Sequence, residues 1–430
     1  MTKFSQMEYK RPDFNALFDE GKAMLGRMEK AGSAQELFDA MQALDNEIRH
    51  LATQRTLAHI RYTINTKDEF YDKENDTFDE ELPRFQEIGT EAARIVLESP
   101  YKDDVAQKYG PHLLEKYEVQ RKVFKPEIVE DLVEENKLSS EYQKLMASAE
   151  IEFDGKKHNL SGLIPYMEST DRGVRRAANA ASWGWIASRQ QELDELYDKL
   201  VKVRHRIGQK LGYENFIPVA YARMGRTDWN QEDARRYRDQ IVESVVPLTG
   251  KLYREQAQRI GISDMKNYDY SLMFLSGNPT PKGEEAYMVD QAKVMYRELS
   301  PETDAFFGIM TGQELMDLTT KPGKANGGYM TFIDDYKVPF IFSNFNGTSG
   351  DVDVLTHEAG HAFQGWLQRD VELKDIADIT SEVAEIHSMS MEFFTHPWME
   401  RFFKEDTEKY FYSHVVDALS FLPYGASIDE

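Results

Sequence analysis

The chain has 430 residues, with 52 lysines and arginines against 75 aspartates and glutamates, so its formal net charge is −23. This acidic balance excludes a protein that follows the phosphate backbone of nucleic acids, and it argues against docking on an anionic membrane surface. The absence of cysteine excludes disulfides, thiolate metal ligands and a cysteine nucleophile.

Two further features bear on location. Residues 1–6 do not form a basic segment followed by an apolar one, so we expect no signal peptide. The uncharged, apolar-looking run over residues 177–188 is too short to cross a bilayer as a helix. We therefore expect a soluble, cytoplasmic protein with neither a nucleic-acid nor a membrane partner.

Helical patterns dominate the first 150 residues. Asp13 suits the N-cap of an apolar repeat that begins at Phe14. Ser33 and Glu36 have the spacing of a capping box in front of a second repeat. The acid-rich run 68–81 lacks the glycine and the terminal glutamate of a calcium loop, and we interpret it as a solvated helix end and connecting loop.

The helical rhythm is interrupted near residue 151. Asp154 and Gly155 stand between two short extended stretches, which indicates a hairpin. We place a boundary there, with an N-terminal helical region over residues 1–150 and a second helical domain over residues 151–430, which contains the segment discussed below as the candidate catalytic one.

Further along, residues 276–283 contain two prolines and two glycines and are expected to form a loop. Pro301, directly after Ser300, suits the first turn of a helix, where its missing N–H costs nothing. Aromatic and β-branched residues gather between Gly327 and Phe345, and they predict two short strands.

The most informative segment is His357-Glu358-Ala-Gly-His361. Two histidines four residues apart lie one turn apart on one face of a helix, so both imidazoles can reach one ion. Glu358 lies beside that face, where it can act on a water without being a ligand. A catalytic zinc site needs neutral imidazoles, an open coordination position and a nearby base.

A third protein ligand is expected in the segment 381–394. Ile386, Met389 and Phe393 predict a helix whose apolar stripe faces the core. A carboxylate on a partly buried face is costly unless a cation or hydrogen-bond donors compensate it. Spacing alone leaves several candidates open for the third ligand: Glu382, Glu385, Glu392 and His387.

The segment from Pro339 to Asp351, running into His357–His361, resembles the thimet oligopeptidase / oligoendopeptidase F family of zinc peptidases. The segment Glu385–Phe394 is similar to the helix that carries that family's third ligand. Weaker similarity lies upstream, at residues 171–175, 212–216 and 321–329, so the resemblance covers nearly the whole chain.

This resemblance implies a mainly α, zincin-like fold with a deep channel for short unfolded peptides and a small β element beside the active-site helix. It implies one Zn²⁺ per chain, with His357, His361 and Glu385 as ligands and Glu358 as the catalytic base. Glu392 would hold a ligand histidine from behind. The strands would form the channel wall, where the substrate-binding candidates are Gly328, Tyr329, Phe342 and Asn344.

The family also has histidine and tyrosine side chains well beyond the third ligand that help to bind substrate and stabilise the oxyanion. Here an amphipathic pattern runs to the last residue, and Tyr410, Tyr412 and His414 stand too early to match. The resemblance therefore leads us to expect a C-terminally truncated chain. Loss of one oxyanion donor typically costs about 2.7–4 kcal/mol of transition-state stabilisation.

The predicted activity is hydrolysis of short oligopeptides by a metal-activated water, with Glu358 as general base. Two alternatives remain open. A zinc metallocarboxypeptidase would require a free C-terminus on its substrate. A catalytically impaired fragment would keep the zinc or peptide pocket as a binding module.

Overall fold

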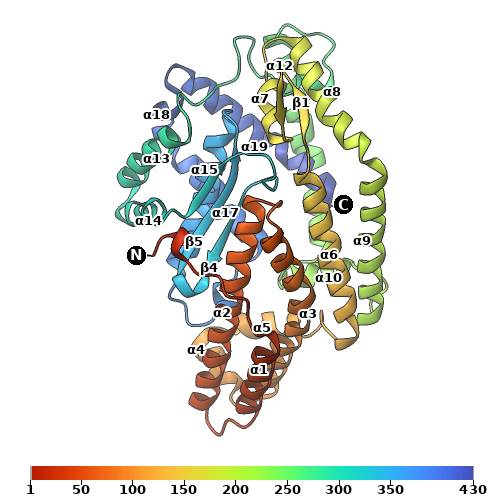
Figure 1. Ribbon diagram of the computed structural model, residues 1–430, viewed down its shortest axis with the longest axis vertical. Helices are drawn as coiled ribbons and strands as arrows, with labels where there is room; N and C mark the ends of the chain where they lie inside the picture. The colour runs from red at the N-terminus through yellow and green to blue at the C-terminus, as the bar shows by residue number, and fades with distance from the viewer. Residues whose placement is uncertain (1, 430) are drawn as a thin grey trace.

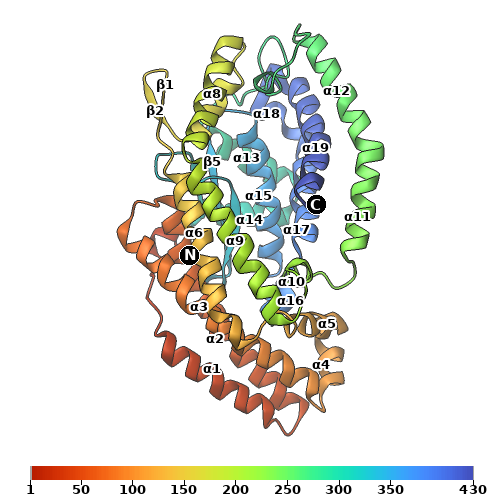
Figure 2. The ribbon, with the colours of Figure 1, turned by 90° about the vertical axis from the view of Figure 1, so that its right-hand side faces the viewer.

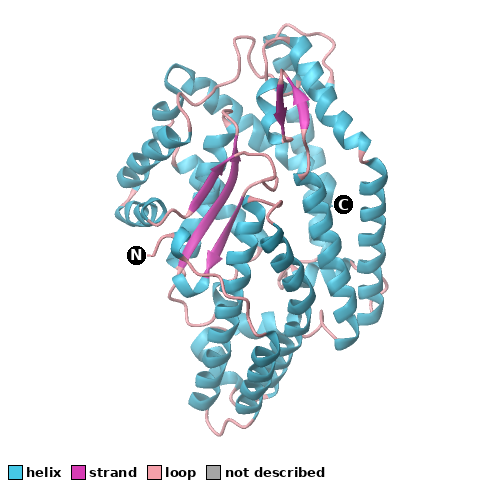
Figure 3. Cartoon of the chain, viewed as in Figure 1, coloured by secondary structure: helices cyan, strands magenta, loops and turns pink. Residues whose placement is uncertain are grey.

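The structure is a computed structural model that describes residues 2–429. Helices form most of it, and the strands gather in two small sheets (Figures 1 and 3). The mainly α fold expected from the sequence is confirmed. None of the helices in the described part is long and apolar enough to cross a membrane.

The first helices are α1 (Phe14–Glu29), α2 (Ala34–Ile64), α3 (Glu69–Glu98), α4 (Lys102–Tyr109), α5 (Pro111–Gln120) and α6 (Val129–Ala147). The middle helices are α7 (Ile164–Met167), α8 (Arg172–Ser188), α9 (Gln190–Leu211), α10 (Ile217–Arg223), α11 (Gln231–Gln240), α12 (Val246–Arg259), α13 (Glu285–Leu299) and α14 (Pro301–Gly312). The last helices are α15 (Gly350–Leu367), α16 (Lys374–Ala377), α17 (Ser381–Phe394), α18 (Glu400–Phe403) and α19 (Thr407–Asp429). The strands are β1 (Ile151–Phe153), β2 (Lys156–His158), β3 (Met316–Thr319), β4 (Tyr329–Ile333) and β5 (Val338–Phe345).

Several helix starts follow the local signals in the sequence. The Asp13 carboxylate accepts the backbone N–H of Ala16 at 3.1 Å, and the Ser33 hydroxyl accepts that of Glu36 at 3.2 Å. Each bond satisfies a donor that the first turn of a helix leaves without a partner. Pro301 is the first residue of α14, behind Ser300 as N-cap. These helix starts are confirmed.

The expected hairpin is present as well. Strands β1 and β2 pair antiparallel, with Ile151 opposite His158. The turn residues Asp154 and Gly155 have φ angles of 49° and 72°. This left-handed region suits glycine and is tolerated by aspartate, which explains the choice of residues at the turn. The boundary placed at this hairpin stays a prediction.

The second sheet has three strands in the order β3-β5-β4, one more than expected. Strand β4 pairs antiparallel to β5, whereas β3 runs parallel to it. Because β5 lies between two strands, it is almost entirely buried, and β4 forms one edge of the sheet. Strand β3 escaped notice because its four residues, interrupted by Asp317, carry no clear alternation.

The largest core surrounds this sheet. It joins β5 and β4 to α13, α14 and α15, and it takes in Met7, Leu57 and Ile60 from the first part of the chain (Figure 1). A fully buried Leu, Ile, Met or Phe side chain stabilises the folded state by about 1.5–3 kcal/mol, because it is removed from water. The sheet and α15 therefore form the well-packed centre of the molecule, on which the candidate site is built.

Two expectations about helices were wrong. The acid-rich run 68–81 is not a connecting loop: Asp68 is the N-cap of α3, and the following residues form its first turns. Glu74 is buried there because Arg11 and Tyr9 bind its carboxylate. The periodic apolar residues Phe70 and Phe78 were therefore a helix signal.

The apolar stripe of α17 also faces the other way. Ile386 and Phe393 are exposed, whereas Ser388, Met391 and Glu392 are buried. The reason is the tight contact with α15 that is described below. This contact requires a small residue, Ser388, on the buried face of α17. The same face carries Glu392, whose buried carboxylate is compensated by hydrogen bonds from two histidines.

Candidate metal centre and active site

The loop in front of helix α15 is held in place by a residue in the first turn of that helix. The carboxylate of Asp351 accepts the backbone N–H groups of Asn346 at 2.9 Å and of Gly347 at 2.7 Å. Gly347 has a φ of 93°, a conformation that glycine adopts without strain. Leu355 and Ala359 bury one side of the helix in the core, which leaves the other side for the histidines.

Helix α17 approaches α15 closely at Gly360. A Cβ atom on Gly360 would lie 2.7 Å from the Cα of Ser388 and 2.8 Å from the carbonyl oxygen of His387. Ser388 is completely buried at this contact. Only glycine permits the two backbones to come so near, and the contact brings Glu385 opposite the two histidines.

Three side chains then converge. The Nε2 atom of His357 lies 3.3 Å from Oε2 of Glu385, and that of His361 lies 3.8 Å from Oε1. One ligand atom from each of the three residues can be chosen so that all lie within 4.8 Å of one another. Ligand atoms of a tetrahedral zinc ion lie about 3.4 Å apart when each is about 2.1 Å from the metal. Two imidazoles and one carboxylate at this spacing fit such an ion.

Glu392 lies behind His357, between two histidines. Its Oε1 lies 2.6 Å from Nδ1 of His357 and its Oε2 lies 2.6 Å from Nε2 of His414, which in turn contacts His396 at 2.9 Å. Burial raises the pKa of Glu392, but the hydrogen bonds from both histidines outweigh it and hold this pKa below its ordinary value. With the Nδ1–H donated to Glu392, His357 presents Nε2 toward Glu385.

The two candidate ligand histidines differ in pKa. Burial lowers the pKa of His357, but the bond to Glu392 and the surrounding carboxylates outweigh it, so this pKa is raised. Burial and the charge of His357 lower the pKa of His361. A metal needs neutral imidazoles, so ion binding would release a proton from His357 at acidic pH.

Glu358 has the properties of a proton carrier. It is buried, and its Oε2 has no hydrogen-bond partner among the described residues. Burial raises its pKa to about 7; the charge of His357 opposes this rise and that of Glu385 adds to it. A carboxylate with such a pKa can take up and release a proton near neutral pH.

The other candidates on α17 lie elsewhere. Glu382 accepts two hydrogen bonds from Arg226, at 2.6 and 2.9 Å. His387 does not belong to the convergent group in the part of the chain that the structure describes. The geometry thus selects Glu385 from the residues that spacing left open, and its role as a ligand stays a prediction.

The substrate-binding candidates have distinct surroundings. Gly328 lies beside Glu358, because a Cβ on it would be 3.3 Å from Oε1 of that residue. The ring of Tyr329 stacks on that of Phe342, with centroids 4.8 Å apart, and Phe342 is fully buried. The amide of Asn344 donates to the carbonyls of Ala325 and Gly327, both at 2.8 Å. Their contact with a substrate stays a prediction; Asn344 also supports the loop that carries Gly328.

Sequence reasoning missed two supporting residues. His414 has no partner at ligand spacing in the sequence, yet it is the second donor to Glu392. Ser388 donates its hydroxyl to Oε2 of Glu385 at 2.9 Å. The contact of His414 depends on the packing of α19 against α17, which no local pattern encodes. Ser388 stands three residues after Glu385 on the same helix, and this spacing was the signal that could have found it.

Two protein-family models match the chain. The one described as Peptidase M3 N-terminal domain matches residues 4–124, and the one described as Peptidase family M3 matches residues 289–420. The second match includes every residue of the candidate metal centre.

Two solved structures are similar to this chain over nearly its whole length. PZ peptidase A, solved with an inhibitor, is 47% identical with a TM-score of 0.98, and the match covers 99% of this chain and 76% of that one. A provisionally assigned oligoendopeptidase F from Bacillus anthracis strain Ames is 46% identical with a TM-score of 0.99, and the match covers 100% and 79% of the two chains.

Curated relatives are more distant. The oligoendopeptidase F homolog of Lactococcus lactis subsp. lactis is 25% identical over 256 residues, which are 57% of this chain and 39% of that protein. The chromosomal oligoendopeptidase F of Lactococcus lactis subsp. cremoris is 26% identical over 53% of this chain and 36% of its own. The matches therefore span less than half the length of these relatives.

The fold and the convergent histidines and glutamate are those of a peptidase scaffold with a candidate metal site. The chain belongs to peptidase family M3, and within it is similar to oligoendopeptidase F. The family resemblance expected from the sequence is confirmed. The deep channel that it implied stays a prediction.

Proposed function

We propose that this chain is a zinc-dependent oligoendopeptidase, in which His357, His361 and Glu385 hold one Zn²⁺ and Glu358 is the general base. The observation that carries the proposal is the convergence of two imidazole nitrogens and a carboxylate beside a buried glutamate whose pKa is raised to about 7. Peptidase chemistry is supported by membership of family M3.

Zinc bound there would polarise the scissile carbonyl and lower the pKa of an attacking water. Glu358 removes the proton from that water with its unpartnered Oε2 and then delivers the proton to the leaving amine. Burial of Glu358 keeps its proton affinity high enough for both steps.

Two neighbours keep the ligands in position. Glu392 holds the ring of His357 so that Nε2 faces Glu385, and Ser388 restrains the Glu385 carboxylate. His414 also donates to Glu392, and the two hydrogen bonds together hold the pKa of this carboxyl below its ordinary value.

The substrates we propose are short, unfolded peptides. Strand β4 is at an edge of its sheet, and Gly328, directly before it, lies beside Glu358. The unpaired backbone groups of an edge strand can bind an extended peptide by adding a strand to the sheet. Folded proteins do not offer such an extended backbone.

The test is the substitution Glu358→Gln, which keeps the shape of the side chain and removes its basicity. We expect zinc at one ion per chain to be retained and turnover of a quenched-fluorescent peptide to fall by about 10²–10⁴-fold. Glu382→Gln is the matched control and should keep turnover, because Glu382 is bound by Arg226 and does not belong to the convergent group of His357, His361 and Glu385.

Peptide cleavage retained by the Glu358→Gln protein would contradict the proposed base. Release of single C-terminal residues that stops when the substrate C-terminus is amidated would favour a metallocarboxypeptidase instead. One zinc per chain with no cleavage by the unchanged protein would indicate a binding module.

A further inference from the structure

A cavity of about 570 Å³ adjoins the candidate active site. It lies between α2, α3, α6 and the loop in front of β4, and its lining includes Asn326 and Gly327. The next residue, Gly328, lies beside Glu358. Since adjacent Cα atoms are about 3.8 Å apart, the cavity begins within one or two residues of the catalytic carboxylate.

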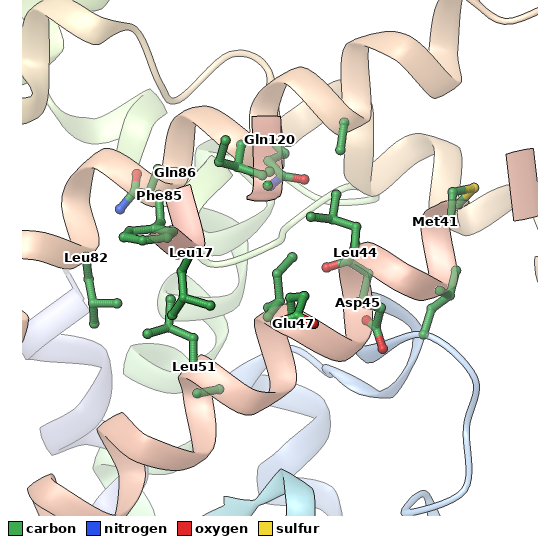
Figure 4. A pocket seen from close by; sticks show the side chains of 18 of the residues that line it. Leu17, Met41, Leu44, Asp45, Glu47, Leu51, Leu82, Phe85, Gln86 and Gln120 are labelled. Atoms are coloured by element: carbon green, nitrogen blue, oxygen red, sulfur yellow. The ribbon is translucent and has the colours of Figure 1, made fainter. Parts of the chain in front are cut away.

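A second cavity, of about 470 Å³, continues between α1, α2, α3 and α5 (Figure 4). Leu17, Leu51 and Leu82 come together on one side of it, each from a different helix. Arg55 and Asn136 line both cavities, so Arg55 stands where the cavity beside the candidate active site adjoins this second one.

Arg55 is the one permanent cation among the residues that line the two cavities. Its guanidinium has no hydrogen bond or ion pair with any of residues 2–429. His59, one turn further along α2, stays neutral at physiological pH, because burial and the charge of Arg55 lower its pKa to about 4. Arg55 is exposed, so its guanidinium is accessible to an anion that enters either cavity. The acidic side chains in the same linings are those of Asp79 in the first cavity and of Asp45, Glu47 and Asp375 in the second.

Asp79 is near Arg55 but has other partners. Its Oδ2 accepts the hydroxyl of Ser140 at 2.5 Å and the amide of Asn75 at 3.3 Å. On the other wall, both polar side-chain atoms of Asn326 are buried without a partner. A side-chain amide offers one acceptor and two donor hydrogens, the complement of a peptide group. The cavity is thus lined by a guanidinium and an amide that have no partner among residues 2–429, and it adjoins the loop that carries Gly328 beside Glu358.

We propose that Arg55 is a specificity-determining residue that binds a carboxylate of the peptide substrate, either its C-terminus or an Asp or Glu side chain a few residues from the cleaved bond. A guanidinium recognises a carboxylate through two parallel hydrogen bonds, which fixes the register of the peptide as well as holding it. This inference rests on the proposed function and names its substrate class: peptides that carry a carboxylate on one side of the scissile bond.

The experiment uses a set of octapeptides whose side chains are otherwise uncharged. In each peptide one Glu is placed at a different position, and a reference peptide has no Glu. Every peptide is made once with a free and once with an amidated C-terminus. Binding is measured by fluorescence anisotropy on the Glu358→Gln protein, which we expect not to cleave them, and kcat and KM are measured on the protein with Glu358. Arg55→Gln removes the cation and Arg55→Lys keeps it. Arg27→Gln, at an exposed position on α1 outside both cavities, removes the same charge and controls for long-range attraction.

We expect Arg55→Gln to weaken binding of the best carboxylate peptide about 10- to 100-fold and to raise its KM, with kcat little changed. Arg55→Lys should restore part of this loss, and Arg27→Gln should cause none. Peptides without the carboxylate should bind the Arg55→Gln protein and the protein with Arg55 equally well. Sensitivity to C-terminal amidation assigns the α-carboxylate, and sensitivity to the position of Glu assigns a side chain.

Equal losses for peptides with and without the carboxylate, no loss with Arg55→Gln, or no peptide binding at all would overturn the inference. The outcome is separate from that of the proposed function. Cleavage that does not depend on Arg55 would support the proposed peptidase activity and contradict the carboxylate subsite. Carboxylate binding that depends on Arg55, without cleavage by the unchanged protein, would support the subsite and contradict the proposed peptidase activity.

Discussion

Helices α15 and α17 carry the three candidate ligands, yet they are held in opposite ways. Helix α15 lies against the sheet, and its two histidine side chains are 27% and 14% exposed. One face of helix α17 packs on α15 (Figure 2). Elsewhere on α17 the Glu385 side chain is 51% exposed, and Ile386 and Phe394 are exposed by 61% and 64%.

This difference separates a preformed pair of ligands from a third that depends on few contacts. The core fixes the register of His357 and His361, whereas Glu385 is positioned by the approach at Gly360 and by the hydroxyl of Ser388. A metal ion would therefore join the two helices, and its binding free energy would contribute to holding α17 in place.

The substitution Gly360→Ala should have the largest effect on this comparison. The new Cβ would meet backbone atoms of Ser388 and His387 at 2.7–2.8 Å, so α17 must shift and Glu385 moves with it. We expect a loss of about 2–4 kcal/mol in the free energy of unfolding, as for other overpacked contacts and strained backbones, and zinc affinity should fall with it. Urea unfolding and zinc titration measure the two effects.

The control for Gly360→Ala is Gly308→Ala in α14, where nothing lies within 4 Å of the added carbon. Alanine should stabilise that helix by up to about 1 kcal/mol. Unchanged zinc affinity in the Gly360→Ala protein would show that α17 does not depend on this contact.

The substitution Glu392→Ala should have the next largest effect. His357 would lose the acceptor of its Nδ1–H, and buried His414 would lose its partner as well. Removal of such a supporting carboxylate typically weakens metal binding about 10–100-fold. Competition with a chelator measures the affinity, and Glu382→Ala on the same helix should leave it unchanged. Equal losses in the two variants would mean that the effect is not specific to His357.

The smallest effect concerns pH. Burial raises the pKa of Asp351, at the start of α15, from 3.8 to about 6, although backbone N–H groups of Asn346 and Gly347 oppose this. The folded state therefore binds the proton more tightly than the unfolded state, and the contribution of Asp351 to stability falls as pH rises from about 4 to about 6. Glu382 on α17 has the opposite sign, because Arg226 and its other hydrogen-bond partners outweigh burial and lower its pKa.

Asp351→Asn should remove this slope. Between pH 4 and pH 6.5 its free energy of unfolding should fall by about 1–3 kcal/mol less than that of the unchanged protein. Urea denaturation at several pH values measures this, and the slope is informative even if the substitution changes stability at all pH values alike. Parallel curves for the two proteins would contradict the raised pKa.

The sequence predicted what depends on neighbouring residues. The caps at Asp13 and Ser33, the turn at Asp154 and the spacing of His357 and His361 are local features, and the helix starts and the hairpin are confirmed. The convergence of Glu385 with the histidines was one of several possibilities until the helices were placed.

The features that were missed depend on packing between distant segments. The stripe of Ile386 and Phe393 indicated a buried face of α17, but Gly360 requires Ser388 at the contact and turns the apolar residues outward. His414 reaches Glu392 only through the packing of α19, and β3 exists because it pairs with β5. Periodicity cannot reveal such contacts, because it describes one element at a time.

The central claim is that His357, His361 and Glu385 hold a single zinc ion while Glu358 stays uncoordinated. Anomalous diffraction from zinc-loaded crystals, recorded on both sides of the zinc edge, tests it most directly. We predict one peak per chain, within about 2.0–2.2 Å of Nε2 of both histidines and of a Glu385 oxygen, and farther from Glu358. A peak coordinated by Glu358, or zinc bound only elsewhere in the chain, would contradict this account.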